Sequence, residues 1–132
     1  MNKRLMAITI LLLVALLGCK GTGSEPSESG GKKVFENRVR VLANENGMQR
    51  ALPEGIVRPV GFKKINGQLR TENGVKRYRL DYEGKVEFLV DIQASAFNGF
   101  RKRKKGEVAI IARSMEFEMT EKGWRGEDGN IY

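Results

Sequence analysis

Apolar and charged residues alternate from Tyr78 to Ile92, except that Gly84 takes an apolar position and Leu89 a charged one. A period of two predicts one long strand with one apolar face, because successive side chains of a strand point to opposite faces. Glu83-Gly84 lies within this segment, but a two-residue turn there would pair Tyr82 with Lys85 and set apolar residues opposite charged ones. We therefore predict a single strand that is bent at Gly84 by a kink or bulge.

Two Asn-Gly dipeptides lie between Pro59 and this strand. Asn73-Gly74 predicts a tight type I′ hairpin, which would place Leu69 opposite Tyr78 on the apolar face. Asn66-Gly67 is too close to it for a second tight turn, so we expect a bulge or bend there. An antiparallel strand should therefore lead into the hairpin.

A further strand is predicted from about Glu107 to Thr120. Apolar residues occupy every second position from Met115, and the residues between them are polar. The stretch from Val108 to Ala112 is apolar throughout, so we expect it to be covered on both faces. Trp124 follows this strand and is expected to cover the edge of the sheet.

The secondary structure of the segment before the sheet is ambiguous. Apolar residues from Phe35 to Leu42 follow helical spacing, although Val39 and Val41 also alternate as in a strand. We predict a helix over Val34–Asn46 that ends at Asn46-Gly47, and an extended connector over Leu52–Pro59.

The predicted fold class is therefore α+β. One N-terminal helix should pack on a curled antiparallel sheet of three to four long strands, because this arrangement buries both apolar faces. This element order resembles the cystatin-like architecture, to which the nuclear-transport-factor-like cone is related. The resemblance lies in element order and not in a motif, and no cystatin-type inhibitory signature is present, so it implies no function.

The chain opens with a basic start, Lys3 and Arg4, and an apolar stretch from Leu5 to Leu17. As a helix this stretch would span roughly 20 Å, less than the roughly 30 Å hydrocarbon core of a bilayer. Its plan is that of a secretory signal peptide. A buried helix or a signal anchor is the alternative, but a Gly/Ser-rich segment follows directly.

Leu16-Leu17-Gly18-Cys19 resembles the lipobox of bacterial lipoproteins, in which an aliphatic residue, a tolerant position and a small residue precede a cysteine. The resemblance implies cleavage between Gly18 and Cys19, thioether lipidation of Cys19, and acylation of the new N-terminus by a fatty acid such as palmitate. Lys20 follows where this family often has Asp for inner-membrane retention, which favours the outer membrane of a Gram-negative cell. A plain secretory signal with an incidental cysteine is the alternative.

Lys20 to Gly31 is rich in Gly and Ser and lacks large apolar residues, so a flexible tether is expected. The predicted organisation is a lipoprotein signal peptide over residues 1–18, the lipidated cysteine and tether over 19–33, and a small α+β domain over 34–132. The mature chain would then be anchored in the cell envelope by the lipid on Cys19.

Catalytic motifs are scarce. The sequence has no histidine and one cysteine, and it contains no nucleotide-binding loop, so we expect neither a metal nor another cofactor and no enzymatic activity. A carboxylate-based hydrolase or a serine–lysine scheme is the remaining catalytic alternative. Its candidate residues are Asp81, Glu83, Glu87, Asp91, Glu116, Glu118, Ser95 and Ser114.

Charge provides the other candidate site. The formal net charge is +8, and five consecutive basic residues form what we call the basic run: Arg101, Lys102, Arg103, Lys104 and Lys105. We expect a loop between two strands. One interpretation is that it binds anionic lipid or a cell-wall polymer, with Phe97 and Phe100 inserting beside the cations. A solvated loop that protects a sheet edge is the alternative. An exported protein rarely meets nucleic acid, so nucleic acid is not expected as a partner.

The function predicted from the sequence is that of a membrane-anchored envelope lipoprotein acting as a non-enzymatic binding or structural module. The alternative partner is an envelope protein, with the chain as a hydrolase inhibitor or an assembly factor.

Overall fold

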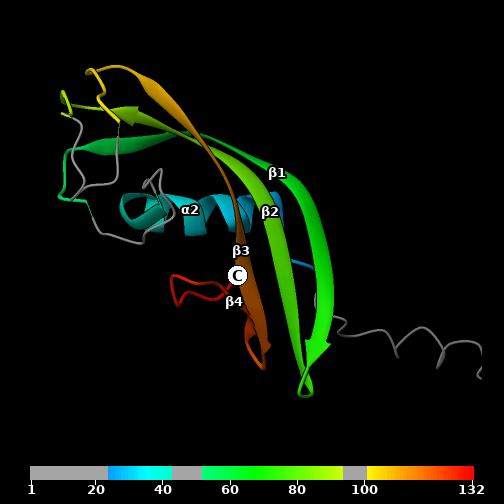
Figure 1. Cartoon of the computed structure of the whole chain (residues 1–132). Coiled ribbons are helices and arrows are strands. Elements are labelled where there is room, and N and C mark those ends of the chain that lie inside the picture. Colours follow the sequence, from blue (N-terminus) through cyan, green and yellow to red (C-terminus); the bar gives the residue numbers. More distant parts are fainter. Residues whose placement is uncertain (1–23, 43–51, 94–100) are drawn as a thin grey trace, which may run out of the picture.

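The structure is a computed structural model that describes residues 24–42, 52–93 and 101–132. It contains helix α2 (Glu28–Leu42) and strands β1 (Val57–Glu72), β2 (Val75–Phe88), β3 (Val108–Thr120) and β4 (Gly123–Arg125). The strands form one antiparallel sheet in the order β1-β2-β3-β4. Figure 1 shows this sheet curving around α2, which lies on its concave side. The predicted α+β arrangement of one helix on a curled antiparallel sheet is confirmed.

The core lies between α2 and the concave face. Phe35 of α2 packs against Phe62 of β1 and Tyr82 of β2, with ring centroids 5.6 Å and 5.7 Å away. Phe62 and Tyr82 stack on each other at 5.1 Å. The even-numbered residues of β2 from Tyr78 to Phe88 are all buried, as the alternation predicted.

The predicted hairpin is confirmed. Asn73 and Gly74 both have positive φ, 51° and 78°, and Leu69 pairs with Tyr78. The β1–β2 register shifts between Pro59 and Gly61 and again between Lys64 and Asn66, so β1 contains two bulges, the second of them beside Asn66-Gly67 as predicted.

A single strand runs through Gly84 as predicted, but the predicted bulge is not found there. β2 keeps its register through this residue, and the bulges are in β1. A Cβ at Gly84 would lie 2.5 Å from the ring of Phe35. The missing side chain therefore admits the aromatic ring of α2 to the sheet. β2 also ends at Phe88 rather than Ile92, which instead forms an isolated bridge with Arg103.

Helix α2 begins six residues earlier than predicted, inside the expected tether. Ser27 caps it, because its Oγ accepts a hydrogen bond from the amide of Gly30 at 3.1 Å. Gly30 and Gly31 are buried, and a Cβ on Gly31 would lie 3.0 Å from Leu80 and Phe62. These glycines are therefore places of close helix–sheet contact and not linker residues. The predicted end at Asn46-Gly47 lies outside the described residues.

Two smaller predictions are also corrected. The segment from Leu52 to Pro59 is not simply extended, because Glu54 and Gly55 form a turn in which Gly55 has a φ of 78°. The start of β3 is not covered on both faces, since Val108 is 50% and Ile110 62% exposed while Ala109 and Ile111 are buried.

The C-terminal segment, residues 126–132, fastens the helix to the sheet. Trp124 on β4 is buried against Tyr78, with ring centroids 6.1 Å apart. Asp128 accepts hydrogen bonds from the side chains of Asn37 on α2 at 2.7 Å and of Tyr132 at 2.6 Å. Arg38 of α2 pairs with Glu127 at 2.7 Å.

In the described part of the chain, no helix is long and apolar enough to cross a membrane.

Candidate anionic-surface site

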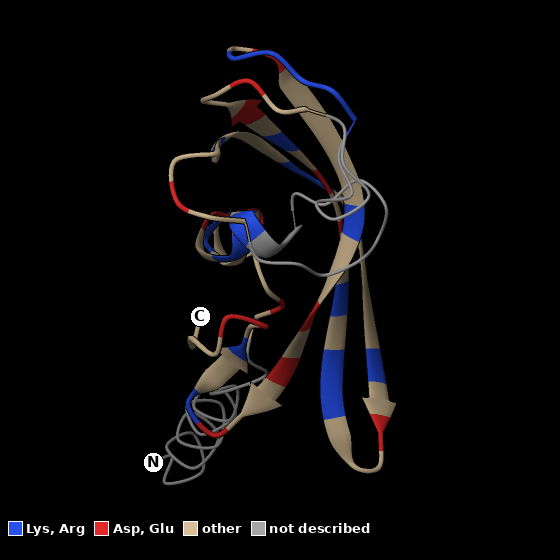
Figure 2. Cartoon of the chain, turned by 60° about the vertical axis from the view of Figure 1, so that its left-hand side comes forward, with Lys and Arg blue, Asp and Glu red and all other residues tan. Residues whose placement is uncertain are grey.

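The basic run lies directly before β3, at the end of the sheet remote from the Asn73-Gly74 hairpin. Figure 2 shows it as a continuous blue segment. As predicted, it belongs to the connection between β2 and β3. The flanking residues Phe97 and Phe100, predicted to insert beside the cations, lie outside the described residues.

Backbone hydrogen bonds hold the basic run against the segment that follows β2. Arg103 and Ile92 exchange two of them, at 2.8 Å and 2.9 Å. The amide of Lys105 donates to the carboxylate of Asp91 at 2.8 Å, and the amide of Gly106 donates to the carbonyl of Phe88 at 2.8 Å. The backbone of this segment is therefore ordered, which fixes where its side chains project.

The five basic side chains are not equivalent. Arg103 lies over the ring of Phe88, 5.7 Å from its centroid, and its guanidinium is 3.9 Å from the carboxylate of Glu107. It is the least exposed member and has a structural role. The other four residues are exposed: Arg101, Lys102, Lys104 and Lys105.

Two exposed aliphatic residues at the start of β3 lie next to the basic run in the chain. Val108 pairs with Glu87 and Ile110 with Lys85 across the β2–β3 ladder, so both lie on the convex face. The carboxylate of Glu87 accepts a hydrogen bond from the guanidinium of Arg58 on β1 at 2.6 Å. We call the four exposed basic residues together with Val108 and Ile110 the basic end. The sequence predicted its cations, but it did not predict that these aliphatic residues are exposed.

The predicted catalytic carboxylates are mostly paired with cations on the exposed convex face. Asp81 accepts hydrogen bonds from Ser114 at 2.6 Å and from Arg79 at 3.0 Å. Both bonds lower the pKa of Asp81, and the bond from Ser114 has the larger effect. A general acid at neutral pH needs a raised carboxyl pKa, so the shift is in the direction opposite to that role.

Further along the same face, Glu116 is paired with Arg70 and Arg77, and Glu118 with Arg77 and Arg125. Ser114 also accepts a bond from Arg79 at 2.9 Å, while Ser95 lies outside the described residues. No group of three or more side chains that could hold a metal ion occurs within residues 24–42, 52–93 and 101–132.

One buried polar group was missed by sequence reasoning. The hydroxyl of Tyr82 has no hydrogen-bond partner among the described residues, and burial raises its pKa to about 12. Its position in the alternation identified Tyr82 as a core residue, but nothing in the pattern shows whether a buried hydroxyl finds an acceptor.

Gly18 and Cys19 lie outside the described residues, so lipidation stays a prediction. Comparison with protein-family models, with curated proteins and with solved structures gives no match.

Proposed function

We propose that this chain is a lipid-anchored envelope protein whose domain binds an anionic surface through the basic end. The observation that carries the surface-binding part is the placement of four exposed basic residues beside exposed Val108 and Ile110. Cations attract anionic headgroups, each contributing about 1 kcal/mol near the surface, while aliphatic side chains gain by leaving water. The anchoring part is supported by the lipobox-like residues that end at Cys19.

Anchoring is tested by growing cells with radioactive palmitate and comparing the wild-type chain with Cys19→Ser. We expect the wild type to be labelled and the variant to lose the label, because the thioether and the new N-terminus both depend on this residue. Equal labelling of the two chains would refute the proposed anchor.

Surface binding is tested with the unlipidated Cys19→Ser chain and vesicles that contain phosphatidylglycerol. Replacing Lys102, Lys104 and Lys105 by Gln should weaken binding by at least about tenfold, since three favourable contacts of about 1 kcal/mol each are lost. Binding should also weaken at high salt, because salt shortens the distance over which charges attract to a few ångströms.

The matched control replaces three exposed lysines away from the basic end, Lys33, Lys63 and Lys122, by Gln. This variant has the same net charge as the first one but keeps the basic end intact, so it should bind much more tightly. Equal loss in both variants would mean that only net charge matters, and the basic end would then be ordinary solvated surface.

An acidic envelope protein is the second candidate partner. Val108 and Ile110 are exposed on the convex face of the sheet, and exposed aliphatic residues close in the chain to cations also suit a protein interface. Crosslinking in intact envelopes through the basic end should then enrich one protein, and the Lys102, Lys104 and Lys105 variant should lose it. Retention of that protein by the variant would argue against this alternative.

A further inference from the structure

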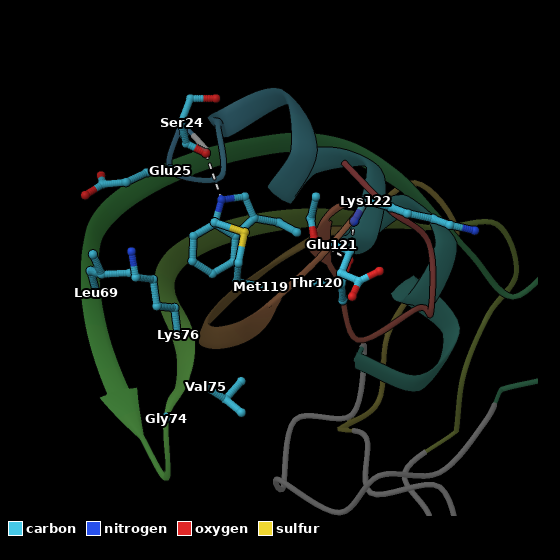
Figure 3. A pocket seen from close by; sticks show the side chains of 12 residues that line it. Ser24, Glu25, Leu69, Gly74, Val75, Lys76, Met119, Thr120, Glu121 and Lys122 are labelled. Carbon is cyan, nitrogen blue, oxygen red and sulfur yellow. Dashed lines mark hydrogen bonds between the residues drawn. The ribbon is translucent and has the colours of Figure 1, made fainter. Parts of the chain in front are cut away.

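A groove of about 970 Å³ lies at the other end of the molecule, near the hairpin and β4. Figure 3 shows Leu69 of β1, Val75 of β2 and Met119 of β3 among the residues that line it. Leu69 is 48% exposed, and Met119 is partly exposed. Side chains from three strands therefore line a groove that no described element fills. Leu69 and Met119 lie on the concave face, whereas Val75 pairs with Glu72 on the other face.

The reason for the groove is the position of α2. The helix packs over the middle of the sheet, where Gly31 meets Leu80 and Phe35 meets Gly84. The concave face beyond Tyr78 is covered by Trp124 but extends further, to Leu69 and Met119. The groove is thus the part of the apolar face that lies beyond the helix.

The start of the described chain lies on the edge of this groove. Ser24 and Glu25 are among its lining residues, and the carbonyl of Ser24 accepts a hydrogen bond from the indole of Trp124 at 2.7 Å. Cys19 is five residues upstream of Ser24, and five residues span at most about 18 Å. A lipid on Cys19 can therefore reach the groove.

The geometry points to one occupant of the groove, an acyl chain of the lipid attached to Cys19. This inference rests on the proposed anchoring. The groove offers an acyl chain apolar contacts with Leu69, Met119 and Trp124, and four charged residues also line it: Glu25, Lys76, Glu121 and Lys122. Covalent attachment keeps the chain at a high effective concentration beside the groove, which favours it over a free lipid.

The test uses the full chain, lipidated in cells that are fed a palmitate analogue with a photoreactive diazirine, and then purified in detergent. After irradiation, mass spectrometry locates the crosslinked peptides. We expect crosslinks to the peptides that contain Val75 and Met119. A labelled chain without crosslinks to these peptides would overturn the groove inference and leave the proposed anchor intact. A chain without any label would overturn both.

Leu69→Glu is the diagnostic variant, because a carboxylate at the groove is unfavourable beside an acyl chain. It should reduce the groove crosslinks roughly tenfold. Val60→Glu is the matched control, since Val60 lies on the same strand and is 45% exposed, close to the 48% of Leu69. Equal crosslinking of both variants would overturn the inference. Met119→Glu repeats the test on β3, and circular dichroism checks that each variant is folded.

A last arm distinguishes the source of the acyl chain. The free diazirine fatty acid is added to the Cys19→Ser chain at the concentration of the lipidated protein. We expect far fewer groove crosslinks than in the lipidated chain. Equal crosslinking would assign the groove to free lipids and overturn the occupant inferred here.

Discussion

Tyr82 and Tyr132 are two tyrosines of this fold whose hydroxyls have opposite surroundings. The hydroxyl of Tyr82 is buried without a partner among the described residues, whereas that of Tyr132 donates to Asp128 at 2.6 Å. Burying an unpaired polar group costs free energy, while a satisfied hydrogen bond contributes about 1 kcal/mol. The two hydroxyls should therefore contribute to stability with opposite sign.

We expect Tyr82→Phe to leave the free energy of unfolding unchanged or to raise it by up to about 1 kcal/mol. Tyr132→Phe should lower it by about 1 kcal/mol or more, because the charged acceptor Asp128 loses a donor. Urea denaturation of both variants checks this pair. A clear loss of stability in Tyr82→Phe would show that its hydroxyl has a bonding partner in solution.

Asp128 should make stability depend on acidic pH. Partial burial opposes its ionisation, but hydrogen bonds from Tyr132, Asn37 and Asn130 outweigh burial and lower its pKa to about 2. A lowered pKa means that the folded state favours the carboxylate, so this contribution is present above pH 4 and is lost as the pH falls from about 4 to about 2.

The measurement is the melting temperature of the wild type and of Asp128→Asn between pH 7 and pH 2. The wild type should lose more stability than the variant below pH 4, so the two curves should converge in acid. Parallel curves over the whole range would contradict the assigned role of Asp128.

At the scale of elements, Gly84 sets how closely α2 approaches the sheet. Gly84→Ala would place a methyl group 2.5 Å from the ring of Phe35, so we expect a loss of about 1–3 kcal/mol in the free energy of unfolding. Gly61→Ala is the matched control. It is also a strand glycine, but the atoms nearest to its Cβ would be those of the exposed Lys85 side chain, at 3.2 Å, so the contact is milder than at Gly84.

The double variant Gly84→Ala with Phe35→Leu identifies the cause. A smaller side chain at position 35 should relieve the clash, so the double variant should lose less stability than the sum of the two single changes. Additive losses would mean that Gly84 is required for another reason.

Elements whose residues favour a single local conformation could be predicted from the sequence. Asn73-Gly74 supplies the two positive φ angles of a type I′ turn, and the charged residues of β2 can only face outward. The start of α2 could not be predicted in the same way, because Gly30 and Gly31 resemble a linker. Their role depends on Leu80, Phe62 and Tyr132, which approach them only in the folded chain.

The candidate site was predictable to a similar extent. Five consecutive cations are visible in any reading of the sequence, but the inward packing of Arg103 on Phe88 depends on the register of the bridge to Ile92. Val108 and Ile110 look like core residues in the sequence. Only the position of α2, which leaves the convex face without a cover, shows that they are exposed.

At the scale of the whole molecule, Ser24, where the described chain begins, and the basic end lie at opposite ends of the sheet. Ser24 is fixed to Trp124 next to the end of β3, and the basic run precedes its start. Thirteen strand residues span roughly 40 Å. Both ends can touch one membrane only when the long axis of the sheet lies along it.

This orientation can be measured on lipidated protein in vesicles. Lys104→Cys and Glu121→Cys each provide a single free thiol for a fluorophore, because Cys19 would be blocked by lipid. On anionic vesicles, both positions should transfer energy efficiently to an acceptor in the headgroup layer. On neutral vesicles, Glu121→Cys should be unchanged and Lys104→Cys should transfer less. A low transfer from position 104 on anionic vesicles would mean that the basic end binds something other than the membrane of its own anchor.

The two bulges of β1 have a consequence for molecules that share a membrane. β1 is the outer strand of the sheet, and sixteen residues of unbroken edge would invite a neighbouring chain to pair with it. The bulges interrupt the regular row of donors and acceptors, and the carboxylate of Glu28 already accepts the amide of Lys64 at 3.0 Å. Copies held at one membrane by the proposed anchor should therefore not join their sheets into fibres.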